Sequence, residues 1–387
     1  MEEFELRSQI LLGEDSTRQF KREPSVEAKM AGEIVAFANS GGGRVFVGVE
    51  KDGSLHGMTG AEAEKIGEDM AKLAWDSVRP QFSILSQSVA TSEGIVVVIE
   101  IPDGPSKPYC DTKGVYWVKN GPDKRRVQSP EELARLFQRG EKLYAENQPV
   151  AASTLEDFDR TRFARFYETK YSESVPDTDS EAYLRILENL ELVTDNRVTV
   201  AGLLLFGKRL PVLLPEMKVD AIWFKGTEKS SEEWWDQRIM TGTLPEQYDG
   251  GMSFLKRWNS RLPREGSFNQ PGRPEIPETV FEELLVNALI HRDYFIKDSI
   301  KLFIFDDRIE IRSPGRLPNS LTVEQMRRGL RRSRNALLAS FAPELVNYRG
   351  IGSGVLRALK NWPSIEWTND KEGEEVVAKI ALSPGSR

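Results

Sequence analysis

The sequence is poor in cysteine and histidine: it has one cysteine, Cys110, and two histidines among 387 residues. A disulfide within the chain is therefore impossible, and a zinc site built from several cysteines is excluded. Long apolar runs are also absent, since none approaches the roughly 18 residues that span a bilayer. Residues 1–10 lack the basic end and apolar core of a signal peptide. We therefore expect a cytoplasmic protein without a membrane partner.

An excess of positive charge is missing as well, because the formal net charge is −7. This argues against a protein that coats nucleic acid by bulk charge, but it is compatible with a local basic groove. Hydrophobic residues make up 39% of the chain and charged residues 29%, as in ordinary globular proteins. The length is sufficient for two domains.

Residues 1–140 have the pattern of one compact α/β domain. Helical periodicity covers 27–40, and strand-like apolar segments follow at 44–50, 94–101 and 114–120. The change from a period near 3.6 to short β-branched runs is typical of mixed helix and sheet.

Residues 141–180 are polar and contain two prolines, so we expect a connector with one helix over 161–171. A second domain is predicted over 181–387, with its core at about 275–387. Within it, VTVAGLLLFG at 198–207 has the composition of a strand.

The stretch EELLVNALIHRDY, residues 282–294, places an acid, an amide and an imidazole four residues apart, at Glu283, Asn287 and His291. Such spacing puts all three side chains on one face of a helix. Thr279 and the glutamate three residues later predict a capping box at its start. Alone, this stripe is compatible with a solvated helix face, a metal site or an ATPase edge.

Three segments follow in an informative order. Residues 301–315 predict two strands around an Asp-Asp turn, ending in Pro-Gly, and 328–341 form an arginine-rich segment that enters a helix. GIGSGVLRAL at 350–359 runs from a glycine-rich loop into another helix. Glycines before a helix allow backbone N–H groups to approach a phosphate. The arginines fit either phosphate contacts or a solvated basic face.

This order of motifs resembles the GHKL ATPases, the fold of gyrase, histidine kinases and MutL. VNALIHRDY, DDRIEIRSPGRLP and RSRNALLASF resemble more specifically the divergent GHKL module of bacterial transcriptional regulators. The resemblance implies an α/β sandwich that binds ATP. In it Asn287 would coordinate Mg²⁺ bridging the phosphates, and Glu283 would orient or deprotonate the attacking water, so we expect ATP hydrolysis.

The resemblance also implies a wider set of nucleotide contacts. The family usually has an aspartate that binds the adenine amino group, and Ser313 stands in its place, which leaves the nucleotide preference open. The arginine-rich segment would form a lid over the nucleotide. The further residues implied for this site are His291, Arg292, Asp293, Gly315, Arg334, Asn335, Gly350, Gly352 and Gly354.

GEDSTRQFKR at 13–22, together with residues 36–58 and 107–121, resembles the AlbA-type domain of Schlafen proteins. Members of that family bind DNA or RNA, and some cut RNA with three carboxylates that hold a divalent metal. Their motif ExxxxEFK has become Glu14…Gln19-Phe-Lys here, so one acid is lost. A metal site with Mn²⁺ at Glu14, Glu50 and Asp52 remains an alternative, but the change favours binding over cleavage.

Basic and aromatic residues of this first domain are candidates for contacts with a nucleic-acid backbone and its bases. The aromatic candidates are Tyr109, Tyr116 and Trp117, and one of the two neighbours on a strand is expected to face the core. The basic candidates are Lys21, Arg22, Arg44, Lys119, Lys124, Arg125 and Arg126.

The sequence therefore predicts a homo-oligomeric regulator that binds Mg²⁺-ATP in its second domain and DNA or RNA in its first. Two alternatives remain open. One is an ATP-gated, metal-dependent nuclease acting in phage defence. The other is a protein-interaction scaffold with a degenerate ATP site.

Overall fold

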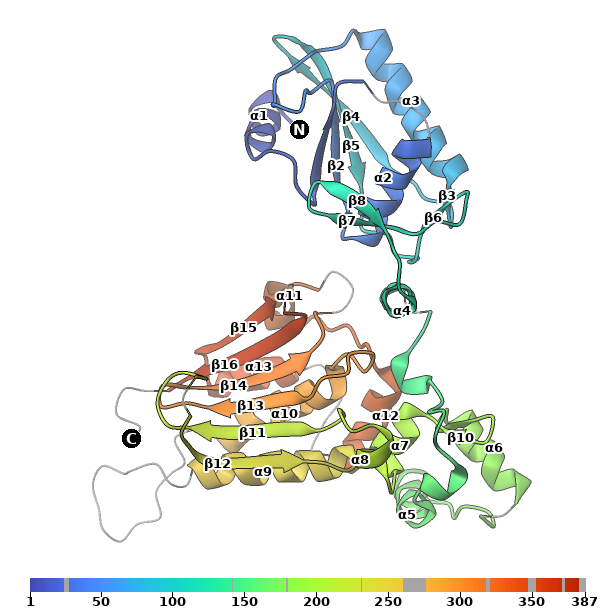
Figure 1. Ribbon diagram of the computed structural model, residues 1–387, viewed down its shortest axis with the longest axis vertical. Helices are drawn as coiled ribbons and strands as arrows, with labels where there is room; N and C mark the ends of the chain where they lie inside the picture. Colours follow the sequence, from blue (N-terminus) through green and yellow to red (C-terminus); the bar gives the residue numbers. More distant parts are fainter. Residues whose placement is uncertain are drawn as a thin grey trace. The chain divides into compact units, whose positions relative to one another are not determined.

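The computed structural model describes residues 1–23, 28–140, 142–178, 180–230, 232–259, 276–317, 321–346, 353–370 and 373–382. The chain divides into two compact units, Met1–Leu143 and Tyr144–Arg387, which are described separately (Figure 1). In the described part of the chain, no helix is both long enough and apolar enough to cross a membrane.

The N-terminal unit is built on a four-stranded sheet with the order β1-β2-β5-β4. Strands β1 and β2 are parallel, whereas β5 pairs antiparallel with both β2 and β4. Apolar residues alternate along β2, so that Phe46 packs on one face and Val45 and Val47 pack on the other. The strands are β1 (Arg18–Lys21), β2 (Gly43–Val47), β4 (Leu85–Thr91) and β5 (Gly94–Ile101).

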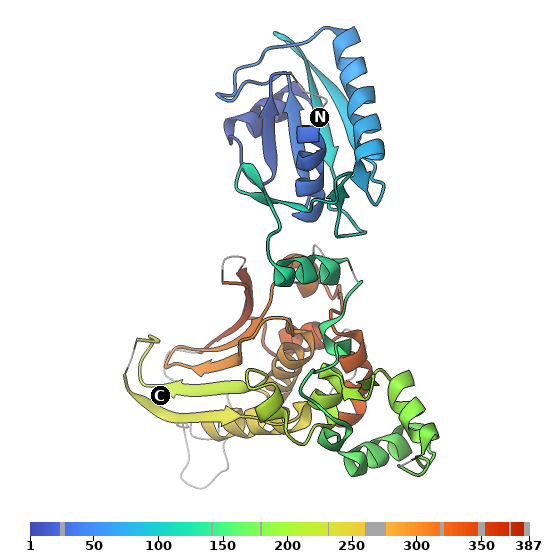
Figure 2. The ribbon, with the colours of Figure 1, turned by 45° about the vertical axis from the view of Figure 1, so that its right-hand side comes forward.

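Helices cover both faces of this sheet (Figures 1 and 2). Leu6 and Ile10 of α1 (Glu3–Leu11) pack against Phe46, whereas α2 (Ala28–Asn39) and α3 (Gly60–Ser77) pack on the opposite face. The remaining elements are β3 (Val78–Arg79), β6 (Cys110–Asp111), the hairpin of β7 (Trp117–Asn120) and β8 (Asp123–Arg126), and α4 (Pro130–Arg139).

The segment expected to be a connector, 141–180, differs from that expectation. From Tyr144 onward it belongs to the C-terminal unit. Phe158, Phe163 and Phe166 are buried there, and they pack against Phe206. The prediction of a connector rested on the many polar residues between these phenylalanines. The segment contains η1 (Ala145–Asn147), η2 (Leu155–Asp157) and α5 (Arg160–Tyr171), the last matching the helix predicted over 161–171.

The C-terminal unit contains a six-stranded sheet with the order β12-β11-β13-β14-β16-β15. Only β11 and β13 pair in parallel among these described strands, and the other neighbours are antiparallel. The hairpin predicted over 301–315 is confirmed as β13 and β14. The strands are β11 (Val219–Phe224), β12 (Trp234–Met240), β13 (Ile300–Ile304), β14 (Arg308–Pro314), β15 (Ile365–Asp370) and β16 (Glu375–Ala381).

Helices α9, α10 and α13 lie on one face of the sheet (Figures 1 and 2). Helices α9 and α10 approach closely, because a Cβ atom on Gly251 would lie 2.7 Å from the side chain of Leu285. The result is an α/β sandwich. Its helices are α6 (Glu181–Asn189), α7 (Val200–Phe206), α8 (Leu210–Leu213), α9 (Leu244–Asn259), α10 (Glu278–His291), α11 (Val323–Arg327), α12 (Ala336–Leu345) and α13 (Gly354–Asn361), with the short strands β9 (Val193–Thr194) and β10 (Arg197–Val198).

The strand predicted over 198–207 is wrong in its main part, because residues 200–206 form α7. Thr199 caps this helix by accepting the N–H of Gly202 at 3.1 Å. Every residue of α7 is buried. A helix without a polar face has no 3.6-residue pattern, and its apolar composition imitates a buried strand.

Candidate functional sites

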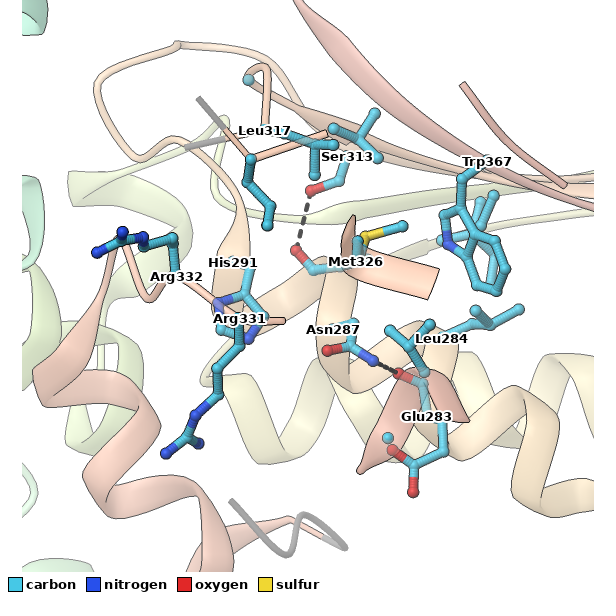
Figure 3. Close-up of a pocket in the computed structure, with 18 of the residues that line it drawn as sticks. Glu283, Leu284, Asn287, His291, Ser313, Leu317, Met326, Arg331, Arg332 and Trp367 are labelled. Carbon is cyan, nitrogen blue, oxygen red and sulfur yellow. Dashed lines mark hydrogen bonds between the residues drawn. The ribbon is translucent and has the colours of Figure 1, made fainter. Parts of the chain in front are cut away.

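A pocket opens beside α10 in the C-terminal unit (Figure 3). Polar and charged side chains lie on one part of its lining, and apolar side chains such as Leu284, Met326 and Trp367 lie on another. Helix α10 supplies Glu283, Asn287 and His291 to its wall, so the structure brings the predicted stripe together around one space. Ser313, Gly315 and Gly354 of the predicted set also line it. Gly350 and Gly352 lie outside the described residues.

Helix α10 is held by burial of nearly all its apolar side chains. It begins at Glu278 after Pro277, and no side chain caps it. The predicted capping box is therefore wrong, because Thr279 already lies inside the helix. The polar side chains of the stripe face the pocket rather than the apolar core.

Glu283 is only 7% exposed, and its carboxylate forms an ion pair with Arg357 of α13. It also packs against the start of that helix. A Cβ atom on Gly354 would lie 2.2 Å from Glu283 Oε2 and 3.4 Å from Asn287 Nδ2. Glycine at 354 is thus required for the carboxylate to occupy this position.

The side-chain amide of Asn287 donates to the carbonyl of Glu283 at 2.6 Å, one turn earlier in α10 (Figure 3). This bond uses the Nδ2 group and leaves Oδ1 as an acceptor at the pocket. Mg²⁺ prefers oxygen ligands and retains several waters in proteins. The orientation of this amide therefore fits a single protein ligand to Mg²⁺.

His291 lines the same pocket with a neutral ring. Burial, with smaller contributions from the nearby charges of Arg334 and Arg331, lowers its pKa to about 4. Nδ1 is buried and has no hydrogen-bond partner among the described residues. Within the described ranges, no group of three His, Cys, Asp or Glu side chains is arranged to hold a metal ion. His291 is thus a neutral polar group rather than a phosphate-binding cation.

Four further predicted residues, Arg292, Asp293, Arg334 and Asn335, are not among the residues that line the pocket. Arg292 is 1% exposed and donates to the carbonyls of Ile296 and Asp298, so it shapes its own loop. Arg334 donates to the carbonyl of Arg316 and lies 3.8 Å from Asp293. Arg334 therefore connects the segment before α12 to the segments that follow α10 and β14.

Asn335 is fully buried and donates to the carbonyls of Ile290 and Arg292, both at 2.8 Å. It thereby ties the start of α12 to the end of α10. Gly315 has a φ of +102°, and a Cβ atom there would lie 2.4 Å from that of Asp293. Only glycine allows this close approach.

The hydroxyl of Ser313 donates to the carbonyl of Ala288 at 3.0 Å (Figure 3). The only hydrogen-bond donor of this side chain is therefore already engaged within the protein. Toward the pocket, the oxygen of Ser313 presents lone pairs only.

Several pocket residues are additional to the predicted contact set. Arg331 and Arg332 belong to the arginine-rich segment, whose role the sequence left open. Other additions include Arg316, Arg357 and the apolar residues Leu317, Met326 and Trp367. Apolar character at 317 and 326 gave no sign of a ligand site. The arrangement combines an apolar surface, a carboxylate, an amide oxygen and a basic rim, as a site for a base linked to phosphates requires.

The three carboxylates proposed for the N-terminal unit are each held locally. Glu14 accepts the N–H of Phe20 at 2.8 Å, and Asp52 accepts the N–H and hydroxyl of Ser54 at 2.9 and 2.7 Å. Glu50 pairs with Arg22 at 3.3 Å. They do not form a common metal site among the described residues. Gln19 is 7% exposed, and its Oε1 has no hydrogen-bond partner in the described part of the chain.

Most of the predicted basic residues have acidic partners, but only Lys119 and Lys124 are also largely buried. Lys119 and Lys124 lie 3.7 and 2.7 Å from the carboxylate of Glu33, and the Lys119 side chain is only 1% exposed. Arg125 pairs with Glu132 at 2.6 Å. The same holds for Arg22 with Glu50 and for Arg44, which lies 3.9 Å from Glu100.

Arg126 is exposed and lies over the ring of Trp117, 5.3 Å from its centroid. Lys21 is partly exposed at the end of β1. Tyr109 is buried in the core, where its hydroxyl accepts the N–H of Ser106, so the suggestion that it stacks on bases is wrong. Tyr116 and Trp117 are both half-buried.

Two parts of the chain match known protein families. Residues 14–128 match the family described as Schlafen, AlbA_2. Residues 297–368 match the family described as "Putative ATP-dependent DNA helicase recG C-terminal". The chain thus carries a Schlafen AlbA_2 domain followed by an ATPase-like domain. The second match begins after α10, so it does not include Glu283 or Asn287.

Two solved structures show similarity at low identity. The DIP2311 protein from Corynebacterium diphtheriae is 20% identical, with 96% of this chain and 76% of that chain covered and a TM-score of 0.47. The N-terminal domain of a RecG-related protein from Nitrosomonas europaea, whose name includes "Putative ATP-dependent DNA Helicase", is 18% identical. That match covers 34% of this chain and 96% of that chain, with a TM-score of 0.26. No curated protein matches the chain.

Proposed function

We propose that the C-terminal unit binds Mg²⁺-ATP and hydrolyses it in the manner of GHKL ATPases. We also propose that the N-terminal unit binds nucleic acid, so that the protein is an ATP-responsive, nucleic-acid-associated regulator. The observation that carries the proposal is the convergence of Glu283, Asn287 and a basic rim on one pocket with an apolar wall. The match to an ATP-dependent family in the same unit supports it.

The phosphates would lie at the basic side of the pocket. Arg331, Arg332 and Arg357 line it, and phosphoryl transfer depends mainly on positioning and charge neutralisation. Asn287 Oδ1 would hold Mg²⁺, which supplies further neutralisation of phosphate charge when bound. Glu283 would orient the attacking water and accept its proton. Arg357 fixes the carboxylate, and Gly354 leaves the space for it.

The base would lie against the apolar wall, near Ser313. Because the hydroxyl proton is donated to Ala288, Ser313 can accept an N–H from the 6-amino group of adenine. It cannot donate to the 6-oxo group of guanine without giving up that bond. The arrangement therefore favours adenine.

The experiment that tests the function compares Asn287→Ala and Glu283→Ala with the unchanged protein. Loss of the magnesium ligand should remove the rise in melting temperature that Mg²⁺-ATP gives, because a ligand stabilises only the state that binds it. Glu283→Ala should retain that rise but lose ATP turnover, by about 10²-fold or more if Glu283 acts as a general base.

The matched control is Glu282→Ala, the neighbouring glutamate of α10 outside the pocket lining. It should change neither binding nor turnover. Unchanged turnover in Glu283→Ala would remove the role assigned to this carboxylate. No thermal shift in the unchanged protein would remove the proposed function itself.

A further inference from the structure

A buried glutamate joins the pocket to the residues that follow the N-terminal unit. Glu146 lies in η1, shortly after Leu143, the last residue of the N-terminal unit. It is 1% exposed, and its carboxylate accepts the N–H groups of Leu337 and Leu338 at 2.9 and 2.7 Å. The partners are nearly two hundred positions apart in the sequence, so this is a tertiary contact.

Both N–H groups belong to the first turn of α12. The first N–H groups of a helix lack partners within the helix, and the positive end of the helix dipole favours a carboxylate. No side chain at the N-cap position, Asn335, accepts a hydrogen bond there. Glu146 therefore performs the capping function from another element.

The capped turn continues directly from the rim of the pocket. Arg331 and Arg332 line the pocket just before α12 begins. Asn335, between them and the helix, donates to the carbonyl of Ile290 near the end of α10 and to that of Arg292, the residue after the helix. Helix α10 in turn carries the polar stripe. The start of α12 is thus fixed to the pocket on one side and to η1 on the other.

Separation of η1 from α12 would be costly. It would leave a buried carboxylate without its hydrogen bonds and two backbone donors without a partner, which is unfavourable for both. A displacement of the arginine-bearing segment must therefore either break these bonds or carry η1 with it. Carrying η1 along is the less costly of the two.

We propose that Glu146 is a positioning residue that makes η1 and the start of α12 move as one body. Nucleotide binding at Arg331 and Arg332 is thereby transmitted to the chain that leads into the N-terminal unit. This rests on the proposed function, because it requires a nucleotide in the pocket. It goes further by assigning the route of communication to one side chain.

Amide hydrogen exchange tests the proposal in the full-length protein, with Mg²⁺ and a nonhydrolysable ATP analogue added. In the unchanged protein, the analogue should slow exchange in α10 and also in residues 144–148. Glu146→Gln keeps the shape but replaces one acceptor oxygen with a donor, so it should retain protection in α10 and lose it in 144–148. Glu146→Ala should do the same. The control Glu156→Gln, an exposed glutamate in η2, should behave like the unchanged protein.

The outcomes separate this inference from the function on which it rests. Protection of α10 without any protection of 144–148 in the unchanged protein overturns the inference and leaves the ATP site intact. Protection of 144–148 that persists in Glu146→Gln also overturns it. Absence of protection everywhere means that the analogue does not bind, and both proposals then fail together. If Glu146→Ala does not fold, Glu146→Gln carries the test.

Discussion

One hydroxyl proton governs what Ser313 presents to the pocket. It is donated to the carbonyl of Ala288, and a buried carbonyl that loses its donor destabilises the protein. We therefore expect the bond to persist when a base enters, so that the side chain acts as an acceptor. An aspartate at this position would accept as well, but as a charged group.

We predict that ATP binds more tightly than GTP, and that Ser313→Ala weakens ATP binding by about 2- to 10-fold, the range of a single net hydrogen bond. GTP binding should be nearly unaffected. Ser313→Thr retains the hydroxyl and is the matched control. Calorimetric titration of both nucleotides measures the difference, and equal affinity of the unchanged protein for GTP and ATP would contradict it.

Two buried titratable residues, Glu146 in η1 and His291 at the end of α10, have opposite pH effects on stability. Burial raises the pKa of Glu146 from 4.5 to about 7, although two backbone N–H groups of α12 oppose the shift. Burial lowers the pKa of His291, at the end of α10, from 6.5 to about 4. Glu146 therefore stabilises the fold below pH 4.5, and this contribution is lost as the pH rises to 7. The contribution of His291 is present above pH 6.5 and is lost as the pH falls to 4.

At about 1.4 kcal/mol per pKa unit, each contribution amounts to roughly 3 kcal/mol, and the two have opposite dependence on pH. We predict that Glu146→Gln gains stability relative to the unchanged protein as the pH rises from 4.5 to 7. His291→Gln should lose stability relative to it as the pH rises from 4 to 6.5. Urea denaturation at several pH values measures both differences. Curves that stay parallel to that of the unchanged protein would refute the assignment.

The elements differ in how far the sequence reveals them. Helix α10 has one polar stripe, and the hairpin of β13 and β14 has a turn with two aspartates, so local patterns predict both. Helix α7 is buried on every side, and a segment without a polar face has no periodicity to read. Its assignment depends on the core around it, which the sequence alone does not supply.

The pocket shows the same division. Glu283, Asn287 and Ser313 follow from motifs within short windows of sequence. Trp367 reaches the pocket because β15 and β16 return beside β14, an order of strands that no local pattern encodes. Arg357 could have been found from the sequence, because it lies three residues after Gly354 of the predicted glycine-rich loop.

At the scale of the whole molecule, the N-terminal unit is expected to bind nucleic acid through its exposed cations and not through its buried ones. Lys119 is buried against Glu33, whereas Arg126 is exposed beside Trp117. We predict that Arg126→Ala weakens binding to single-stranded DNA or tRNA and reduces the salt dependence of the binding constant by about one unit of slope. Lys119→Ala should mainly lower the melting temperature.

The same preparations distinguish binding from cleavage. With Mn²⁺ present, tRNA and single-stranded DNA should remain intact, because Glu14, Glu50 and Asp52 are held by separate partners. Cleavage that disappears in Glu14→Ala would support a nuclease instead.

The aromatic packing of the segment after Tyr144 constrains how such a protein can be divided. Phe166 stacks on Phe341 of α12, with ring centroids 4.9 Å apart, and truncation of a buried phenylalanine typically costs about 3–5 kcal/mol. A fragment that began at residue 181 would lose this ring together with Phe158 and Phe163. If gene fusion joined the C-terminal unit to a different N-terminal domain, the transferred segment would therefore have to begin at Tyr144 to keep this packing. The segment after Tyr144 has the composition of a linker, but it is the first part of the C-terminal unit.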